Sequence, residues 1–452
     1  MKRAAIFIVA LVCFVSVRGQ NLQTGYFMSD YAYSYRLNPA FSPSYSFVGL
    51  PGISSASVGL QGNIGLDNVL YPGDGGLVTF LHPDVSASDV LSGLDKTASR
   101  FSADVGTNIL AIGIRTGNLF NTIDVSVRNY VDGSIPYDFF RFLKDGASES
   151  GDFDLSGLQA RGTSFVEIGF GSSWGRRKVT YGIRLKGLVG VADFNVKMDR
   201  AHLSLDGKEW KVDADGTLTG AYDGMKIRKK KSATGQYDDV IDFKNSEYGL
   251  LKGMNGFGLA MDFGLKADLG KVELSASVTD VGASYWFNNL RGRTPGESWT
   301  FTGGDDLISS GKGGIGEQFS GMVDELVEVF EFRNEGDANE IRLLPFTARA
   351  GVKVEVAERL SLGALGTYRH DSAFRYWEGR AVADYKPFKA LELAASAGYN
   401  TYGLAFGAML NVHCPGVSFF IGTDGLFYKV NPQFIPLGKP NTDIALGLNI
   451  AW

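Results

Sequence analysis

The residue types that most often carry catalysis are few in this sequence, and their spacing does not fit a catalytic or metal-binding arrangement. The four histidines are His82, His202, His370 and His413. No two of them are spaced like the ligands of a metal site. The stretch H-D-S at 370–372 holds three residue types found in catalytic triads, but a triad is defined by side chains that meet in space. We therefore expect a protein that is not an enzyme, with no catalytic residue, metal site or cofactor.

Three short motifs resemble binding sites, and each has a simpler explanation. D-A-D-G at 213–216 is similar to part of a calcium loop, but Lys211 stands where an acidic ligand is expected, so we interpret it as a solvated turn. G-F-G at 256–258 lacks the rest of a dinucleotide fingerprint. The basic run at 226–231 is either a solvated hairpin edge or a contact for anionic surface polysaccharide or lipid.

A larger set of charged residues alternates with apolar residues in extended segments. If these segments form a transmembrane barrel, the charges must face the lumen, because a basic side chain facing lipid costs roughly 2–4 kcal/mol at the bilayer midplane. Basic and acidic residues are equally numerous in the set. This balance predicts ion pairs that brace the wall or hold a plug, whereas a single sign would indicate an ion-selective pore. The residues expected to face the lumen are Asp124, Arg128, Glu167, Arg184, Lys186, Asp262, Lys266, Glu273, Arg349, Lys353, Glu355, Arg369, Arg380, Asp384, Glu392 and Asp443.

The segments that carry these charges have apolar residues at every second position, which is the period of a β-strand. For example, Tyr181 and Ile183 share one face and Arg184 lies on the other. Each segment is near the roughly 9–11 residues that cross a bilayer at a tilt. About 14 of them can be placed, at 53–65, 105–115, 122–130, 163–174, 179–191, 257–265, 272–278, 346–356, 360–369, 379–385, 391–400, 402–412, 417–423 and 442–452.

The connections between these segments alternate between two lengths. One set is mostly long: 66–104, 132–161, 198–255, 284–344, 370–378, 400–402 and 424–441. The other set is short: 117–121, 174–178, 268–270, 357–359, 386–389 and 413–415. Short periplasmic turns and long extracellular loops are typical of outer-membrane barrels. The sequence therefore predicts an all-β fold, a transmembrane antiparallel β-barrel of about 14 strands with both termini periplasmic. Its long loops contain short helices, which we place at Pro136–Lys144 and Glu317–Phe332 from their helical periodicity.

The last segment, Thr442 to Trp452, shows the alternation most clearly. Ile444, Leu446 and Ile450 share an apolar face, and the opposite face is small or polar. A half-buried strand of a soluble sheet has the same pattern, so this stretch alone leaves both explanations open. The other segments and the loop lengths favour exposure to lipid. We expect Ile450 and Trp452 to form a C-terminal signal for barrel assembly.

The amino-terminal residues resemble a secretory signal. Lys2 and Arg3 precede an apolar run, and a small-residue cleavage site ends at Gly19. We therefore divide the chain into a signal peptide at 1–19, a periplasmic or lumenal segment at 20–52 and the barrel at 53–452. The net charge of −5 argues against a nucleic-acid binder. Cys414 is the one cysteine beyond the signal, so an intramolecular disulfide is not expected.

Several motifs resemble those of an uncharacterised family of outer-membrane β-barrel proteins found in Bacteroidetes, the DUF5723 type. They are Y-R-L-N-P-A-F-S-P at 35–43, L-P-G-I at 50–53, I-P-Y-D at 135–138 and the hairpin between Gly258 and Gly282. The element that contains Arg36, Asn38 and Pro39 is distantly similar to one in the long-chain fatty-acid transporter superfamily, which includes a shuttle barrel of a secretion system. The resemblance implies a barrel and an amino-terminal segment that enters the lumen. The ligand-binding residues of that transporter find no counterpart here, so its substrate does not carry over.

Two functions follow as expectations. The first is an outer-membrane barrel for passage or capture of a small hydrophobic or amphipathic molecule. The second is a non-conducting structural or shuttle component of a secretion or surface-assembly system. The expected partners are outer-membrane lipid, the barrel-assembly machinery and either a small hydrophobic ligand or a secretion-system protein, with no nucleic acid.

Overall fold

The structure is a computed structural model that describes residues 22–52, 54–73, 76–145, 151–206, 209–222, 224–231, 237–242, 253–294, 299–302, 332–370, 375–426 and 441–452. The predicted signal peptide lies outside the described residues, as does all but the last residue of the predicted helix at Glu317–Phe332.

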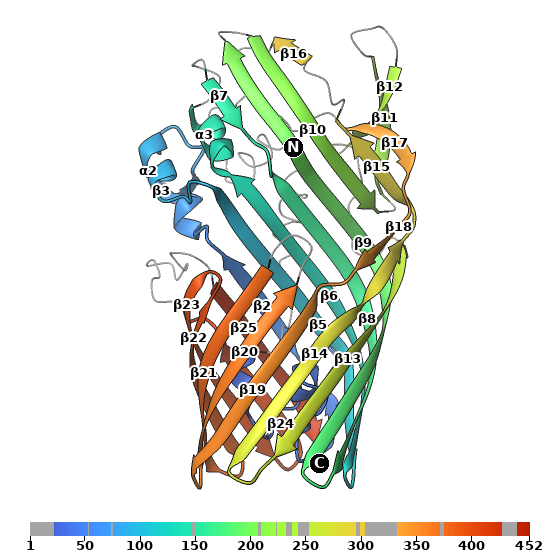
Figure 1. Ribbon diagram of the computed structural model, residues 1–452, viewed down its shortest axis with the longest axis vertical. Helices are drawn as coiled ribbons and strands as arrows, with labels where there is room; N and C mark the ends of the chain where they lie inside the picture. Colours follow the sequence, from blue (N-terminus) through green and yellow to red (C-terminus); the bar gives the residue numbers. More distant parts are fainter. Residues whose placement is uncertain are drawn as a thin grey trace.

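Among the described residues, 14 strands close into an antiparallel β-barrel, which confirms the predicted fold (Figure 1). Strands that follow one another in the wall are paired, and the barrel closes where the last strand pairs with the first. The first wall strand has two parts, β1 (Phe47–Gly49) and β2 (Ala56–Gly62). The others, in order around the barrel, are β5 (Ala98–Thr116), β6 (Leu119–Pro136), β8 (Gln159–Arg176), β9 (Val179–Asp206), β13 (Gly256–Asp268), β14 (Val272–Trp286), β19 (Phe346–Ala357), β20 (Leu360–His370), β21 (Arg375–Phe388), β22 (Leu391–Asn400), β23 (Gly403–Cys414), β24 (Val417–Thr423) and β25 (Asn441–Ala451).

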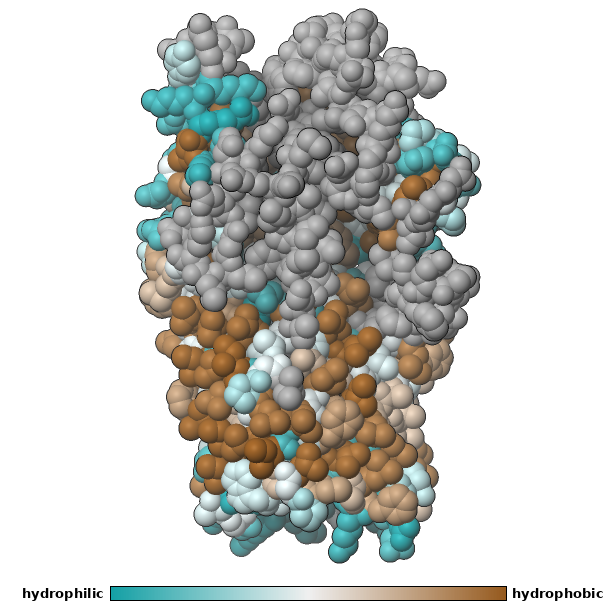
Figure 2. Space-filling model, turned by 180° about the vertical axis from the view of Figure 1, so that it is seen from behind, coloured by the Kyte–Doolittle hydropathy of each residue, from teal (hydrophilic) through white to brown (hydrophobic). Residues whose placement is uncertain are grey.

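The alternation in the sequence places apolar side chains on the outside of the barrel. In β25, Ile444, Leu446 and Ile450 are 40%, 41% and 48% exposed. Ala445 and Asn449, on the other face, are 2% and 1% exposed. Figure 2 shows the outward residues as a brown belt above a more hydrophilic lower rim. An apolar belt over a polar interior is the pattern of strands that face lipid.

The two ends of the barrel differ as the connection lengths predicted. At the end that we call the turn end, two or three residues join the strands, at 117–118, 177–178, 269–271, 358–359, 389–390 and 415–416. The opposite end, the loop end, carries the longer connections. Four strands also continue past the belt there: β5, β6, β8 and β9 have 19, 18, 18 and 28 residues. The sequence segments were shorter because the apolar alternation ends where the bilayer ends.

The extended strands support a second layer at the loop end. β10 (Glu209–Ala221) pairs with β9. The helix predicted at Pro136–Lys144 is present as α3 (Tyr137–Asp145). The inner face of this layer is an apolar cluster that includes Phe80, Phe140 and Phe153. Among the described residues, no helix is long and apolar enough to span a membrane. The remaining elements are η3 (Leu66–Asn68), β3 (Leu70–Gly73), β4 (Gly76–Thr79), α2 (Ala87–Ser92), β7 (Gly151–Asp154), β11 (Lys226–Lys231), β12 (Tyr237–Asp242), β15 (Asn289–Arg293), β16 (Trp299–Thr302), β17 (Arg333–Asp337) and β18 (Glu340–Leu343).

The first wall strand starts earlier than the sequence indicated. β1 already pairs with β25 and β5, six residues before the predicted barrel boundary at residue 53. Residues 50–52, 54 and 55 lie outside the ladder, and pairing resumes at Ala56. Pro51 and Gly52 are exposed in this interruption, and proline cannot donate a ladder hydrogen bond. Because of this interruption, β1 does not belong to a continuously alternating segment of the sequence, and the alternation did not predict it.

Candidate functional site

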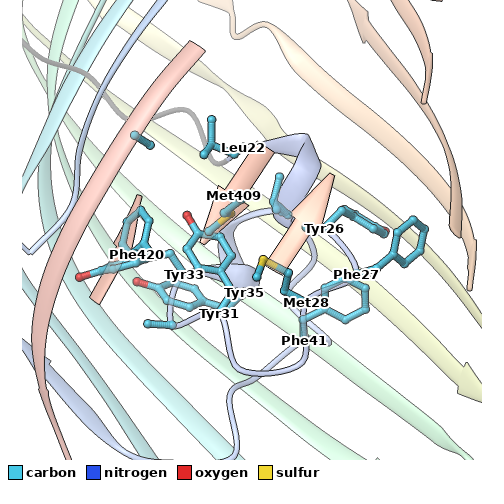
Figure 3. Close-up of a cluster of buried hydrophobic side chains, with 14 of the residues drawn as sticks. Leu22, Tyr26, Phe27, Met28, Tyr31, Tyr33, Tyr35, Phe41, Met409 and Phe420 are labelled. Carbon is cyan, nitrogen blue, oxygen red and sulfur yellow. The ribbon is translucent and has the colours of Figure 1, made fainter. Parts of the chain in front are cut away.

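Residues 22–46, which we call the plug, fill the lumen in the turn-end half of the barrel. Two short helical turns, η1 (Gln23–Gly25) and η2 (Ser34–Arg36), are joined by compact loops. The tyrosines Tyr26, Tyr31, Tyr33 and Tyr35 are at most 2% exposed. Figure 3 shows these rings packed with Phe41 and with the wall residues Met409 and Phe420. The Tyr-rich stretch of the sequence is therefore a core inside the barrel.

The Asn38-Pro39-Ala40 turn rests on two glycines of the wall. Gly182 of β9 and Gly264 of β13 are direct cross-strand partners. A Cβ atom on Gly182 would lie 2.0 Å from the carbonyl carbon of Pro39, and one on Gly264 would lie 2.1 Å from Oδ1 of Asn38. The Asn38 amide also donates to the backbone carbonyls of Leu265 and Ala276 at 3.2 Å. Only glycine at both wall positions leaves room for this close approach.

Carboxylates of the wall bind backbone N–H groups of the plug. Asp424, which follows β24, accepts from the N–H groups of Gln23 at 2.6 Å and Thr24 at 2.8 Å. Glu392 of β22 accepts from the N–H groups of Ser29 at 2.7 Å and Asp30 at 3.1 Å. Each carboxylate accepts from two successive N–H groups, of which those of Thr24 and Asp30 are buried, so the wall fixes the path of the plug backbone at both places.

Asp30 ties the plug to the turn end of the wall. Its carboxylate pairs with Lys386 of β21 and accepts from the hydroxyl of Ser44 at 2.6 Å. Burial acts to raise the pKa of Asp30, but the hydrogen bonds from Lys386 and Ser44 outweigh it and hold that pKa below its usual value. Asp30 is therefore ionised at neutral pH.

Arg184 is the centre of a buried ion network just above the plug. Its guanidinium lies 2.6 Å from Asp124, 2.8 Å from Glu167 and 3.3 Å from Asp262. These four residues come from the adjacent strands β6, β8, β9 and β13. All four were expected to face the lumen, and the structure brings them into contact. Arg184 is 2% exposed, and such burial is tolerated only when a charge is compensated.

Three more cations and one more anion complete the network. Arg36 of the plug lies 2.5 Å from Asp124. Asp280 lies 2.7 Å from both Arg128 and Lys186. The network then contains Arg36, Arg128, Arg184 and Lys186 with Asp124, Glu167, Asp262 and Asp280. The two signs balance within this network, and every member takes part in an ion pair.

Asp280 was missed because a bulge moves it to the inner face. The pairing of β13 and β14 shifts register between Met261 and Phe263, and Asp280 has a φ of 66°. Strict alternation would turn Asp280 outward, since Val278 is on the lipid face. Aspartate tolerates the left-handed region better than most residues, and its N–H donates to Asp262 at 2.7 Å. The sequence sign of this bulge was T-D-V-G at 279–282, where an aspartate stands at a position that strict alternation assigns to the lipid face.

The other residues expected in the lumen lie elsewhere along the wall. Lys353 donates to the Phe27 carbonyl at 2.8 Å and lies 3.5 Å from Asp384. Arg380 binds Glu378 at 2.5 Å. Lys266 and Glu273 form a partly exposed pair, 3.7 Å apart, near the turn end. Arg349 donates to Gln23 at 3.2 Å, and Asp443 accepts from Gln61 at 3.3 Å. Arg369 faces a cavity. Glu355 is exposed at the turn-end rim.

A cavity lies above the plug, on the loop-end side of the ion network. Its lining includes charged side chains, among them Arg128, Arg349 and Arg369. It also includes the apolar and aromatic side chains of Tyr130, Phe165, Leu188 and Leu344, and Phe165 is the cross-strand partner of Arg128. Phe165 packs against Trp286, with ring centroids 5.3 Å apart, so the aromatic part of the lining is rigidly supported. The volume of the cavity is about 90 Å³, which holds only a few water molecules.

Two neutral polar side chains also face this cavity. Asn108 and Ser126 are 1% and 2% exposed and belong to β5 and β6. Among the described residues, the Ser126 hydroxyl has no hydrogen-bond partner, and the Asn108 carboxamide lies beside the hydroxyl of Tyr33 outside ordinary hydrogen-bond geometry. Buried groups of this kind need a partner, so the Ser126 hydroxyl is available to a bound molecule or to water.

The short motifs take other places. D-A-D-G at 213–216 lies within β10, where Asp213 binds Arg200 at 3.1 Å and Asp215 binds Arg293 at 3.2 Å. The predicted turn was therefore wrong, because paired charges allow acidic residues in a strand. The basic run forms β11, whose Lys229 stands opposite Asp239 of β12 in a solvated hairpin. His370 ends β20, and 371–374 lie outside the described residues.

Comparison with known proteins gives a family and a set of barrels. A family model described as a family of unknown function (DUF5723) matches residues 39–424. No curated protein matches the chain. Among solved structures, the toluene transporter TbuX of Ralstonia pickettii is 8% identical, with a TM-score of 0.44 over 93% of each chain. A FadL homologue of Pseudomonas aeruginosa is 11% identical, with a TM-score of 0.41 over 97% of this chain and 99% of the other. Toluene transport is a property of the first of these proteins.

Proposed function

The chain belongs to the DUF5723 family, as its motifs indicated, and we propose that it is an outer-membrane barrel through which a small hydrophobic or amphipathic molecule passes. The apolar belt and the separation of short turns from long loops support this location. In this orientation the loop end is extracellular, and the turn end and the plug face the periplasm. The carboxy-terminal residue Trp452 then lies at the periplasmic rim.

The mixed lining of the cavity above the plug is the observation that carries the proposal. An apolar group fits against Phe165, Leu188 and Leu344. A charged or hydrogen-bonding group fits against the arginines, Asn108 and Ser126, which line the same cavity. Pockets that combine an apolar wall with a few fixed polar groups orient amphipathic ligands, because each part of the ligand keeps a compatible surface.

The plug decides how a molecule crosses the rest of the lumen. The space above it is too small for anything but a few water molecules, so a larger molecule requires the plug to shift. Much of the docking of the plug uses polar and ionic contacts, which water can replace if the plug moves toward the aqueous end. We therefore place the plug on the route of passage, as its gate.

Uptake into proteoliposomes tests this function. The probe is radiolabelled naphthalene sulfonate, which joins an apolar ring to a permanent charge and crosses pure lipid slowly. We expect saturable uptake of the probe, no uptake of sucrose, and a several-fold loss in Phe165→Ala. Phe153→Ala is the matched control, since Phe153 belongs to the loop-end cluster. Uptake no faster than in protein-free vesicles would overturn the proposal.

The alternative is a non-conducting structural or shuttle component, and the firm docking of the plug is the observation that favours it. The same uptake assay separates the two functions. A sealed barrel that copurifies with a stoichiometric protein partner from native membranes would support the alternative. Saturable uptake that depends on Phe165 would exclude it.

A further inference from the structure

The seam that closes the barrel contains a gap in its backbone ladder. β1 pairs with β25 as far as Gly49 opposite Asn449, and pairing resumes at Ala56 opposite Leu446. Six positions of the chain separate Gly49 from Ala56, whereas only two separate Asn449 from Leu446. Among the described residues of this stretch, one backbone hydrogen bond crosses the seam, from Leu50 to Leu448 (3.5 Å). The other two, Gly52 to Asn108 (3.3 Å) and Asn108 to Ser55 (3.0 Å), join the first strand to β5 on its other side. The bond across the seam is long, so this is a thin place in the ladder.

Tyr33 of the plug lies directly behind the gap. Its hydroxyl donates to Oδ1 of Asn449 on β25 at 2.6 Å, and its side chain is fully buried. A Cβ atom on Gly49 would lie 3.0 Å from this hydroxyl and 2.4 Å from Cβ of Ser54. Tyr33 thus lies inside the lumen at the last pair before the gap, Gly49 and Asn449.

The surrounding aromatic rings hold Tyr33 in this position. Its ring centroid is 5.5 Å from that of Phe47 on β1 and 5.7 Å from that of Phe420 on β24. These two phenylalanines come from opposite sides of the seam. Aromatic pairs at such distances contribute beyond the area that they bury, so the ring connects the first strand to the last pair of strands.

The carboxy-terminal end of the plug leads straight into the seam. Ser46 and Trp452 exchange two backbone hydrogen bonds of 3.0 Å, one in each direction. Tyr45 shares a hydrogen bond of 2.8 Å with Ser418 of β24. The plug and the closing strands therefore form one continuous set of contacts.

We propose that the plug closes the barrel as well as blocking it, with Tyr33 as the residue that holds the interrupted first strand against β25. Closure of the wall then depends on a docked plug. This role does not depend on what the lumen transports. It makes Tyr33 a positioning residue, whose loss weakens the seam more than it weakens other parts of the barrel.

A disulfide across the seam tests this role. Val48 and Ile450 are direct partners on the lipid side of β1 and β25, at a separation that antiparallel pairing makes suitable for a disulfide. Both are changed to cysteine in a Cys414→Ser background. We expect Tyr33→Ala to lower the temperature at which the folded band unfolds on heated gels when the disulfide is reduced. Oxidation should restore most of that loss, because the disulfide replaces the contact that Tyr33 supplies.

Tyr26→Ala is the matched control. Tyr26 is another fully buried plug tyrosine, but it packs near Gly351 of β19, away from the seam. The lowered unfolding temperature of Tyr26→Ala should persist when the cysteine pair across the seam is oxidised. Tyr33→Phe, which keeps the ring, should show a smaller loss with the same rescue. If Tyr33→Ala alone does not insert into the membrane, the proposal requires that the same variant does insert when it carries the oxidised cysteine pair at positions 48 and 450. An unchanged Tyr33→Ala, an equal loss in oxidised and reduced forms, or equal rescue of Tyr26→Ala would overturn it.

Discussion

Arg36 of the plug and Asp124 of the wall form an ion pair of 2.5 Å that joins two segments 88 residues apart in the sequence. Asp124 has no exposed surface, and it also binds Arg184 at 2.6 Å. One carboxylate therefore holds a cation of the plug and a cation of the barrel. This shared anion makes the plug part of the charge balance of the lumen.

Removal of Arg36 should destabilise the docked plug strongly. Arg36→Met leaves the buried Asp124 carboxylate with one cation, and breaking a buried pair costs about 3–5 kcal/mol. The measurement is the temperature at which the folded band converts to the unfolded one on heated gels. Arg200→Met is the control, because Arg200 pairs with Asp213 on an exposed strand, where an ion pair contributes at most about 1 kcal/mol. Equal shifts for the two variants would contradict the role of the network.

A methyl group on Gly182 should displace the Asn38-Pro39-Ala40 turn. The added Cβ would lie 2.0 Å from the backbone of Pro39, so the turn must move. We expect Gly182→Ala to increase hydrogen exchange of the plug, measured by mass spectrometry on protein in detergent. Gly187→Ala on the same strand is the matched control, since its Cβ would meet no atom within 4 Å. Equal protection of the plug in both variants would show that the close contact at Gly182 does not hold the turn in place.

Acid should loosen the turn-end part of the plug. The pKa of Asp30 is lowered in the folded protein, because hydrogen bonds from Lys386 and Ser44 outweigh its burial. Such a group stabilises the fold above its unfolded pKa of about 3.9, and that contribution is lost as pH falls through the lower folded pKa. Hydrogen exchange near Asp30 should therefore rise below about pH 4. Asp30→Asn should show weaker protection at neutral pH and no further change over the same acid range. A similar acid response in that variant would assign the effect to another group.

The barrel could be predicted because lipid imposes a strict rule on every wall strand. Alternation in segments such as 179–191 and 442–452, with the two classes of connection, predicted the strand number and the two ends. The extension of β9 to Asp206 could not be read in this way, because beyond the bilayer both faces of a strand can be polar or apolar. The break between β1 and β2 could not be predicted either, because the alternation pattern identifies only continuous strands.

The candidate site could be predicted in part. Asp124, Glu167, Arg184 and Asp262 were assigned to the lumen by parity alone, and the structure places them in one network. Asp280 was missed because a bulge changes parity locally. The contact of Arg36 with Asp124 depends on how the plug folds inside a closed wall, which no local pattern records. The Bacteroidetes origin and the periplasmic termini stay predictions.

A reversible lock on the plug tests most directly whether the plug is the gate. The hydroxyl oxygens of Thr24 and Ser396 are 2.7 Å apart, so cysteines at these positions can join plug to wall. In a Cys414→Ser background, we predict that oxidised Thr24→Cys/Ser396→Cys protein takes up no naphthalene sulfonate and that reduction restores uptake. The oxidised seam pair at Val48 and Ile450, which leaves the plug free, should retain uptake. Equal uptake with the plug locked and unlocked would contradict the account.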